Sequence, residues 1–136
     1  MWRFLSSQRS QGSEPAETGA EILDGETLRD FNRVLVAVIE DTVSALLGHS
    51  VLEALHEHLE NHHSISKDAL PAHLKTLHEV LQRAIGFAAS TTVERAVARA
   101  LYVRLRIRFR SSSNLTLLEY VDEAKRNLAE QSHSRS

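Results

Sequence analysis

The stretch LRDFNRVLVAVIEDTVSALLG, residues 28–48, carries the strongest periodic signal in the sequence. Its apolar side chains recur in steps of three and four, the spacing that places residues on one face of an α-helix. Gly48 follows the last periodic residue, at the position where helices commonly end. We therefore predict a helix over residues 25–47, about 34 Å long at 1.5 Å per residue. The apolar stripe consists of Leu28, Phe31, Leu35, Val38, Thr42 and Ala45, and is widened by Val34, Ile39, Val43 and Leu46.

Two further helices are predicted on the C-terminal side of Gly48. Ser50 is a residue type that favours the N-cap, so we place the start of a second helix there and its end near residues 62–66. Pro71 suits the first turn of a third helix, because proline lacks the N–H that the first turn leaves unpaired. Gly86 is expected to close this third helix.

Two capping boxes predict a fourth and a fifth helix. Thr91 is followed three residues later by Glu94, and Thr116 is followed three residues later by Glu119. In this pattern the threonine hydroxyl and the glutamate carboxylate each accept a backbone N–H of the first turn. The expected fold class is therefore all-α, a compact bundle of about five helices whose apolar faces pack together.

The stretch LYVRLRIRFR, residues 101–110, alternates apolar and arginine side chains over its second half. Such alternation is typical of a half-buried strand, but no second strand is evident in the sequence for it to pair with. We predict that the fourth helix continues to about Leu105 and that a short extended segment follows near residues 106–110. Its apolar side chains, Ile107 and Phe109, would then point into the core. A two-stranded ribbon formed by this segment in two subunits is an alternative.

Length and composition limit the classes of protein to which the chain can belong. Its 136 residues allow one domain with tails, and the low content of Gly (5) and Pro (2) favours long helices. The absence of cysteine excludes disulfides and thiolate chemistry, and it fits a reducing cytoplasm. The longest wholly apolar run, residues 34–39, is far shorter than the roughly 20 residues that cross a bilayer. We expect a cytoplasmic protein without a membrane span.

The two ends of the chain lack periodic apolar residues. Residues 1–21 mix Ser, Gln, Gly, Glu and Pro, a composition that does not offset the entropy of ordering a chain. Residues 131–136 have a similar composition. We therefore expect a disordered N-terminal tail over 1–21, a helical domain over 22–130 and a disordered C-terminal tail over 131–136.

Positive charge is concentrated in one short block. Residues 91–110 hold six arginines and one glutamate, a net charge of +5, whereas residues 1–90 hold 7 basic and 13 acidic side chains, a net charge of −6. Arginines in such a block can contact nucleic-acid phosphates, but the sequence pI of about 6.4 is low for a nucleic-acid-binding protein. Salt bridges to acidic surfaces of this chain or of a second subunit are the preferred interpretation. The candidate interaction residues are Arg95, Arg99, Arg104, Arg106, Arg108 and Arg110.

The sequence contains eight histidines, of which six lie from residue 56 to residue 78. His58 and His62 are four residues apart, so one helical face would present two imidazoles and makes these two residues weak candidates for a metal site. A solvated polar face is the preferred interpretation, and we expect no cofactor. The glycines are isolated, so no phosphate-binding loop is predicted, and no set of catalytic residues is evident. We expect no enzymatic activity and no small-molecule substrate.

Residues 38–109 resemble the small helical domain called the Nitrosopumilus output domain, which occurs alone or behind receiver domains in archaeal two-component systems. The segment NLTLLEYVDEAKRN, residues 114–127, is similar to the last helix of that family. Arg106 stands where the family has a glycine, and the chain contains no receiver domain. The resemblance carries no active site and implies a signalling or regulatory module. It rests on Leu47–Gly48, His58–Leu59–Glu60, the HSIS segment at 63–66, Ile85–Gly86–Phe87 and Ala100–Leu101–Tyr102.

These observations together predict a non-enzymatic regulatory module that acts through protein–protein interaction. The predicted helix over 25–47 is apolar on more than one side, and such a helix is usually buried within a domain or between subunits. We therefore expect the chain to form a homodimer. The alternative is a nucleic-acid-binding regulator that uses the arginines of residues 95–110.

Overall fold

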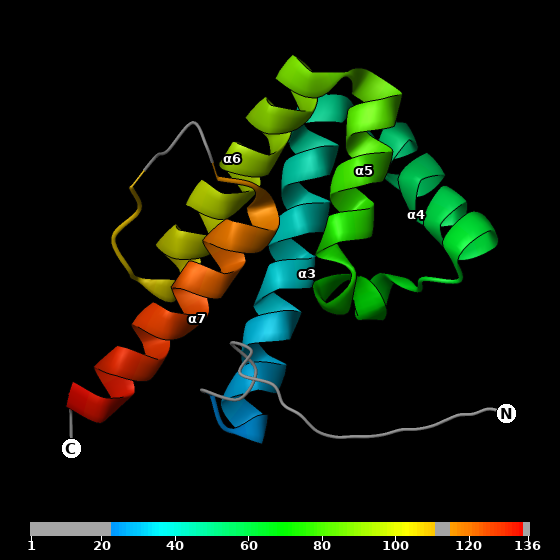
Figure 1. Cartoon of the computed structure of the whole chain (residues 1–136). Coiled ribbons are helices and arrows are strands. Elements are labelled where there is room, and N and C mark those ends of the chain that lie inside the picture. The colour runs from blue at the N-terminus through cyan, green and yellow to red at the C-terminus, as the bar shows by residue number, and fades with distance from the viewer. Residues whose placement is uncertain (1–22, 111–114, 135–136) are drawn as a thin grey trace, which may run out of the picture.

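The computed structural model describes residues 23–110 and 115–134, and it is all-α over these ranges, as predicted from the sequence (Figure 1). The expected N-terminal tail, residues 1–21, lies outside the described residues. No helix of the described part is both long and apolar enough to cross a membrane. In chain order the helices are α3 (Gly25–Leu47), α4 (His49–His63), the 3₁₀ helix η2 (Lys67–Ala72), α5 (Leu74–Ile85), α6 (Phe87–Leu105) and α7 (Leu117–Ser134).

Helix α3 forms the centre of the bundle and has the bounds that its periodicity predicts. Asp24 caps it, since its Oδ1 accepts a hydrogen bond from the backbone N–H of Thr27 at 2.8 Å, and this bond lowers the pKa of the Asp24 carboxyl. The helices that pack most extensively on α3 are α4, α6 and η2. Most of the apolar surface of α3 is therefore covered within the domain and does not by itself require a second subunit, although Leu46 near its end stays exposed. Its buried residues are Phe31, Leu35, Val38, Ile39 and Val43.

Helices α3 and α4 are joined at a single residue, Gly48. Its backbone has φ 100° and ψ 154°, a conformation that is essentially restricted to glycine, and it ends α3 and caps α4 at once. The prediction that Ser50 is the N-cap of the second helix is wrong, because α4 already begins at His49 and Ser50 lies in its first turn. The sharp corner at Gly48 needs no linker, so no separate capping residue is required.

Helices α5 and α6 meet in the same way at Gly86, which has φ 91° and ψ 167°. Helix α6 begins at Phe87, so Thr91 and Glu94 lie inside it and the predicted capping box at these residues is wrong. Both glycine corners lie at the same end of the bundle, the upper end in Figure 1. The starts of α4 and α6 therefore lie at the same end of the bundle.

Pro71 does not begin the third long helix. It lies inside η2, and α5 starts three residues later at Leu74. His73 separates the two helices with φ −132° and ψ 38°, outside the helical range. The prediction for the first turn is therefore wrong, whereas the predicted end of this helix at Gly86 is confirmed.

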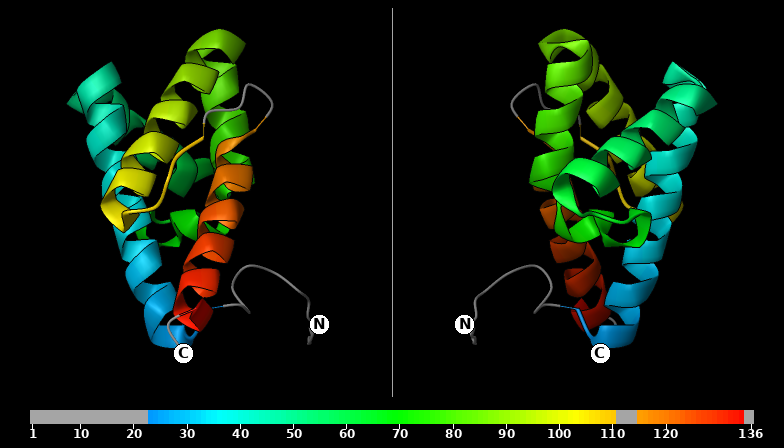
Figure 2. Two further views of the ribbon diagram at one scale, coloured as in Figure 1. Left: turned by 90° about the vertical axis from the view of Figure 1, so that its left-hand side faces the viewer. Right: turned by 90° about the vertical axis from the view of Figure 1, so that its right-hand side faces the viewer.

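The stretch at 101–110 behaves as predicted: α6 ends at Leu105 and an extended segment follows. Arg106 adopts the left-handed conformation, φ 61°, and its N–H donates to the carbonyl of Val103, while the N–H of Ile107 donates to that of Tyr102. These two bonds are those of a Schellman motif. Ile107 is buried, and the segment runs back between α6 and α7 (Figure 2).

Helix α7 is held at its start by the predicted capping box. The backbone N–H of Thr116 donates to Oε1 of Glu119 at 2.8 Å, and the N–H of Glu119 donates to the hydroxyl of Thr116 at 3.3 Å. The helix extends to Ser134, so residues 131–134 are helical and the expectation of a disordered tail from residue 131 is wrong for them.

Candidate protein-interaction surfaces

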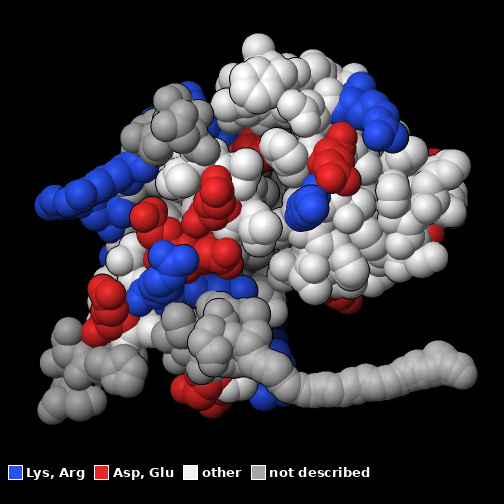
Figure 3. Space-filling view, in the orientation of Figure 1, with Lys and Arg blue, Asp and Glu red and all other residues white. Residues whose placement is uncertain are grey.

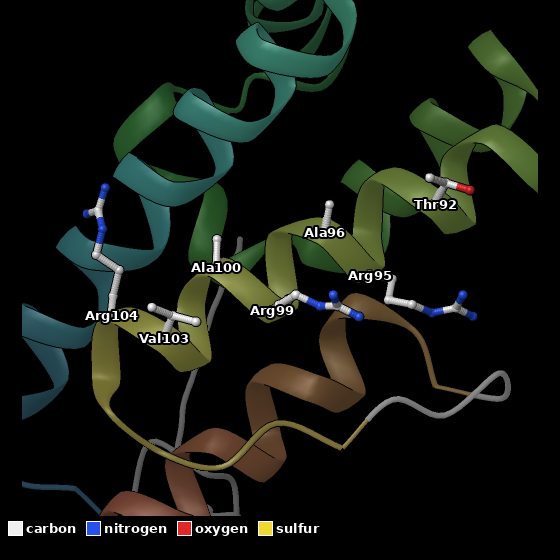
Figure 4. A pocket seen from close by; sticks show the side chains of 7 residues that line it. All are labelled: Thr92, Arg95, Ala96, Arg99, Ala100, Val103 and Arg104. Atoms are coloured by element: carbon white, nitrogen blue, oxygen red, sulfur yellow. The ribbon is translucent and has the colours of Figure 1, made fainter.

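Three of the six candidate arginines share one exposed face of α6. Figure 4 shows Arg95 and Arg99 extending along one side of this face and Arg104 along the side next to α3, with small side chains between them. The hollow over this face has a volume of about 570 Å³. We call these residues the arginine face: Thr92, Arg95, Ala96, Arg99, Ala100, Val103 and Arg104.

The arginines of this face have few acidic partners. Arg104 Nη2 lies 3.1 Å from Oδ2 of Asp41 on α3, and both side chains are largely exposed, so this pair adds little stability. The guanidinium of Arg99 lies over the ring of Phe109, 5.4 Å from its centroid. Arg95 Nε is buried and has no hydrogen-bond partner among the described residues.

The other three arginines lie elsewhere. Arg106 forms the left-handed end of α6 and is exposed, as are Arg108 and Arg110 on the extended segment. Arg108 and Arg110 line a separate hollow of about 530 Å³ beside Glu123 of α7. The end of α6 at Arg106 thus divides the block, which is continuous in sequence, into two surfaces.

The upper end of the bundle exposes apolar side chains that the sequence did not single out. Phe87, the first residue of α6, is 68% exposed, and Leu46 and Val51, on either side of the Gly48 corner, are 52% and 40% exposed. Figure 3 shows that the surface at this end is largely uncharged. We call Leu46, Val51 and Phe87 the apolar end.

An apolar groove continues from this end between α4 and α5. These two helices pack on other elements and have few direct contacts with each other, which leaves a groove of about 460 Å³. Its volume lies within the range of known ligand pockets. The apolar residues that line this α4–α5 groove are Leu47, Val51, Ala54, Leu55, Val80, Leu81, Ala84 and Ile85.

The polar rim of the α4–α5 groove carries both signs of charge. Glu79 and Arg83 lie one helical turn apart on α5, and His58 and His63 lie on α4. A rim with both acidic and basic side chains can pair with an identical rim, because each charged group can contact a group of opposite charge on the other copy.

The candidate metal residues, His58 and His62, are adjacent and exposed on α4. Their ring centroids are 4.6 Å apart, and the ring of His63 lies 5.5 Å from that of His58. No group of three or more potential metal-ligating side chains occurs within residues 23–110 and 115–131. The structure therefore brings together the two imidazoles of the prediction without adding a further ligand from another element.

A buried carboxylate that sequence reasoning missed joins three helices. Glu94 of α6 is 4% exposed, and one of its oxygens accepts a hydrogen bond from the backbone N–H of Leu117 at 2.9 Å. Its other oxygen is hydrogen-bonded to Nδ1 of His78 on α5. Leu117 is the first residue of α7, so Glu94 pairs an N–H that the helix leaves free and places a negative charge where the helix dipole favours one.

Comparisons with models of protein families, with curated proteins and with solved structures give no match to this chain. The resemblance of residues 38–109 to the Nitrosopumilus output domain therefore stays a prediction from the sequence.

Proposed function

We propose that this protein is a non-enzymatic regulatory module that acts by binding proteins, and that two copies associate through the apolar end and the α4–α5 groove. The observation that carries this proposal is that Phe87 is exposed and follows, two residues on, Ile85, which lines an open apolar groove. The regulatory context rests on the sequence resemblance alone, and the lack of cysteine fits a cytoplasmic location.

The energetic support comes from apolar surface that remains exposed in a single copy. Burying a phenylalanine side chain is worth about 1.5–3 kcal/mol, and contiguous exposed apolar patches typically mark interaction sites. Phe87, Leu46 and Val51 are brought to one end by the two glycine corners, although Leu46 and Phe87 are far apart in sequence. This surface is therefore created by the fold.

The shape and charge of the same end favour a second copy as the partner. In a symmetric dimer the same patch of both copies forms the interface, so that patch must contain both partners of every contact. Here an exposed aromatic residue, Phe87, lies two residues after Ile85 of the groove, and the groove rim carries Glu79 together with Arg83. Each Phe87 can enter the groove of the other copy while Glu79 of each copy pairs with Arg83 of the other.

Nucleic-acid binding is less well supported by the arrangement of the arginines. A polyanion is held best by one continuous basic surface, whereas Arg108 and Arg110 line a separate hollow that also contains Glu123. Asp41 lies next to Arg104 on the edge of that face. No observation of the structure favours this alternative over protein binding.

Sedimentation equilibrium of two matched variants tests the dimer. Phe87→Asp and Val103→Asp place a charge at equally exposed positions, 68% and 70%, near opposite ends of α6. We expect Phe87→Asp to raise the dimer Kd at least tenfold and Val103→Asp to leave it within twofold of the wild type. A wild-type chain that stays monomeric at several hundred micromolar, or equal effects of both variants, would contradict the proposal.

A further inference from the structure

We propose that the arginine face of α6 binds an acidic amphipathic helix of a partner protein other than a second copy of this chain. This surface is distinct from the apolar end, and the inference does not depend on dimer formation. It rests on the small residues of the face, on the sign of its charges and on Arg95 and Arg99, which form no ion pair within the described residues.

The floor of the arginine face allows close approach of another helix. Thr92, Ala96 and Ala100 are small and lie in steps of four along α6, and Val103 continues the row with 70% of its side chain exposed. Packed helices lie 8–10 Å apart, and small side chains at the contact permit the shorter distances. From Thr92 to Arg104 the face is about 18 Å long at 1.5 Å per residue, which accommodates more than three turns of a partner helix.

The charges that flank this floor have one sign. Arg95 and Arg99 lie on one side and Arg104 on the other (Figure 4). A helix whose apolar stripe is bordered by glutamates or aspartates would place carboxylates next to both rows. Arginine binds carboxylates with paired, charge-assisted hydrogen bonds, and within the described residues Arg95 and Arg99 form no ion pair with an acidic side chain.

A second copy is a poor partner for this face. Two copies that packed their α6 helices antiparallel about a two-fold axis would bring the Arg95–Arg99 side of each against the same side of the other. Like charges in direct apposition oppose association. Of the acidic side chains, Asp41 alone forms an ion pair with an arginine of this face in the described part of the chain.

A nucleic acid also fits this face less well than a protein does. Phosphates bind basic side chains and do not cover an apolar floor, so Ala96, Ala100 and Val103 would stay exposed beneath a sugar–phosphate backbone. A partner helix covers this floor and pairs with the arginines at the same time. The chemistry of the face as a whole therefore favours an acidic amphipathic helix.

The test uses designed helical peptides and the Phe87→Asp chain, so that dimerisation does not interfere. One peptide has leucines in steps of three and four bordered by glutamates, and its control has lysines in place of the glutamates. Binding of each peptide, and of a duplex DNA, is measured for three proteins: the parent, Arg95→Ala with Arg99→Ala, and Arg108→Ala with Arg110→Ala. The two double variants remove the same charge from different surfaces.

We expect the glutamate peptide to bind the parent, and its Kd to rise at least tenfold when Arg95 and Arg99 are replaced. Replacement of Arg108 and Arg110 should change this Kd by less than twofold. Equal losses in the two variants, comparable binding of the lysine peptide, or no binding of the glutamate peptide would overturn the inference. Duplex DNA that binds the parent more tightly than the peptide and depends on Arg95 and Arg99 would also overturn it. Arg99, Arg108 and Arg110 are exposed and Arg95 is half-buried, so circular dichroism should show unchanged helix content.

Discussion

At the scale of single residues, two glycines allow the chain to change direction sharply between consecutive helices. Gly48 and Gly86 combine a positive φ with a ψ near 160°, a region that is essentially restricted to glycine. A Cβ added at either position would meet no atom within 4 Å. A side chain at either position would therefore destabilise the protein through its unfavourable backbone conformation and not through steric clashes.

Gly86→Ala should lower the free energy of unfolding by about 1–3 kcal/mol, the typical cost of a strained backbone conformation. Urea unfolding measures this change. Gly25→Ala is the matched control, because Gly25 lies in the first turn of α3 without a positive φ and also has open space around it. We expect the control to be neutral or slightly stabilising. Equal effects at the two positions would show that Gly86 has no special backbone role.

Arg106 adopts a backbone conformation that is unfavourable for any residue other than glycine. It has φ 61° at the end of α6, and the left-handed conformation costs a residue other than glycine about 1–2 kcal/mol. Arg106→Gly should therefore raise the free energy of unfolding by about 1 kcal/mol. Arg108→Gly, at an exposed position of the extended segment without a positive φ, should be neutral or destabilising. A destabilised Arg106→Gly chain in thermal or urea unfolding would contradict this assignment.

At the scale of helices, identical local patterns have different outcomes. Of the two T-x-x-E segments predicted to form capping boxes, residues 91–94 and 116–119, only the second forms one. The first lies inside α6, where Glu94 turns to a backbone N–H that is 23 residues away in sequence. Helix positions and most of their ends could be predicted from periodicity and glycines, but a buried polar partner at long range leaves no local signal.

Glu94→Ala tests whether this carboxylate fastens α7 to the bundle. The change leaves the buried N–H of Leu117 and the half-buried Nδ1 of His78 without their acceptor, so we expect a loss of about 2 kcal/mol in the free energy of unfolding. Hydrogen exchange should show faster exchange in the first turn of α7 than in α3. Glu57→Ala, at an exposed position of α4, should change stability by less than about 0.5 kcal/mol. Unchanged exchange at the start of α7 would rule out the fastening role.

Tyr102 links α6 to α7 in a way that depends on pH. Its hydroxyl donates to the backbone carbonyl of Tyr120 at 2.7 Å, and burial, followed by the nearby Glu123, raises the pKa of the Tyr102 phenol. An unfolded tyrosine ionises near pH 10, so the unfolded chain gains stability above that pH while the folded chain keeps the proton. Stability should therefore fall as pH rises above about 10.

The alkaline loss should be smaller in Tyr102→Phe, which removes the phenol and its hydrogen bond. Urea unfolding at pH 9 and pH 11 measures the difference for both proteins. At pH 9 the variant should be less stable by about 1 kcal/mol, because the hydrogen bond is absent. An equal alkaline loss in the two proteins would mean that Tyr102 does not account for the pH dependence.

At the scale of the whole molecule, the interaction surfaces arise from how the helices are arranged. The arginine block is visible in the sequence, but the end of α6 at Arg106 separates its residues into two surfaces. The apolar end is not visible in the sequence, because Leu46, Val51 and Phe87 lie at the same end of the bundle only as a result of the two glycine corners. Local patterns identify helices and charged segments, and the assignment of a surface requires the packing of elements that are distant in sequence.

The most direct test of the central claim is a distance measurement between two copies. The chain has no cysteine, so Ala88→Cys and Glu130→Cys each provide one site for a spin label, at an exposed position beside the apolar end and at one near the end of α7. Double electron–electron resonance on each singly labelled protein reports the distance between copies. Association through the apolar end predicts a shorter, well-defined distance for the label at residue 88 than for the label at residue 130. The absence of dipolar coupling at both positions, or a shorter distance at residue 130, would contradict it.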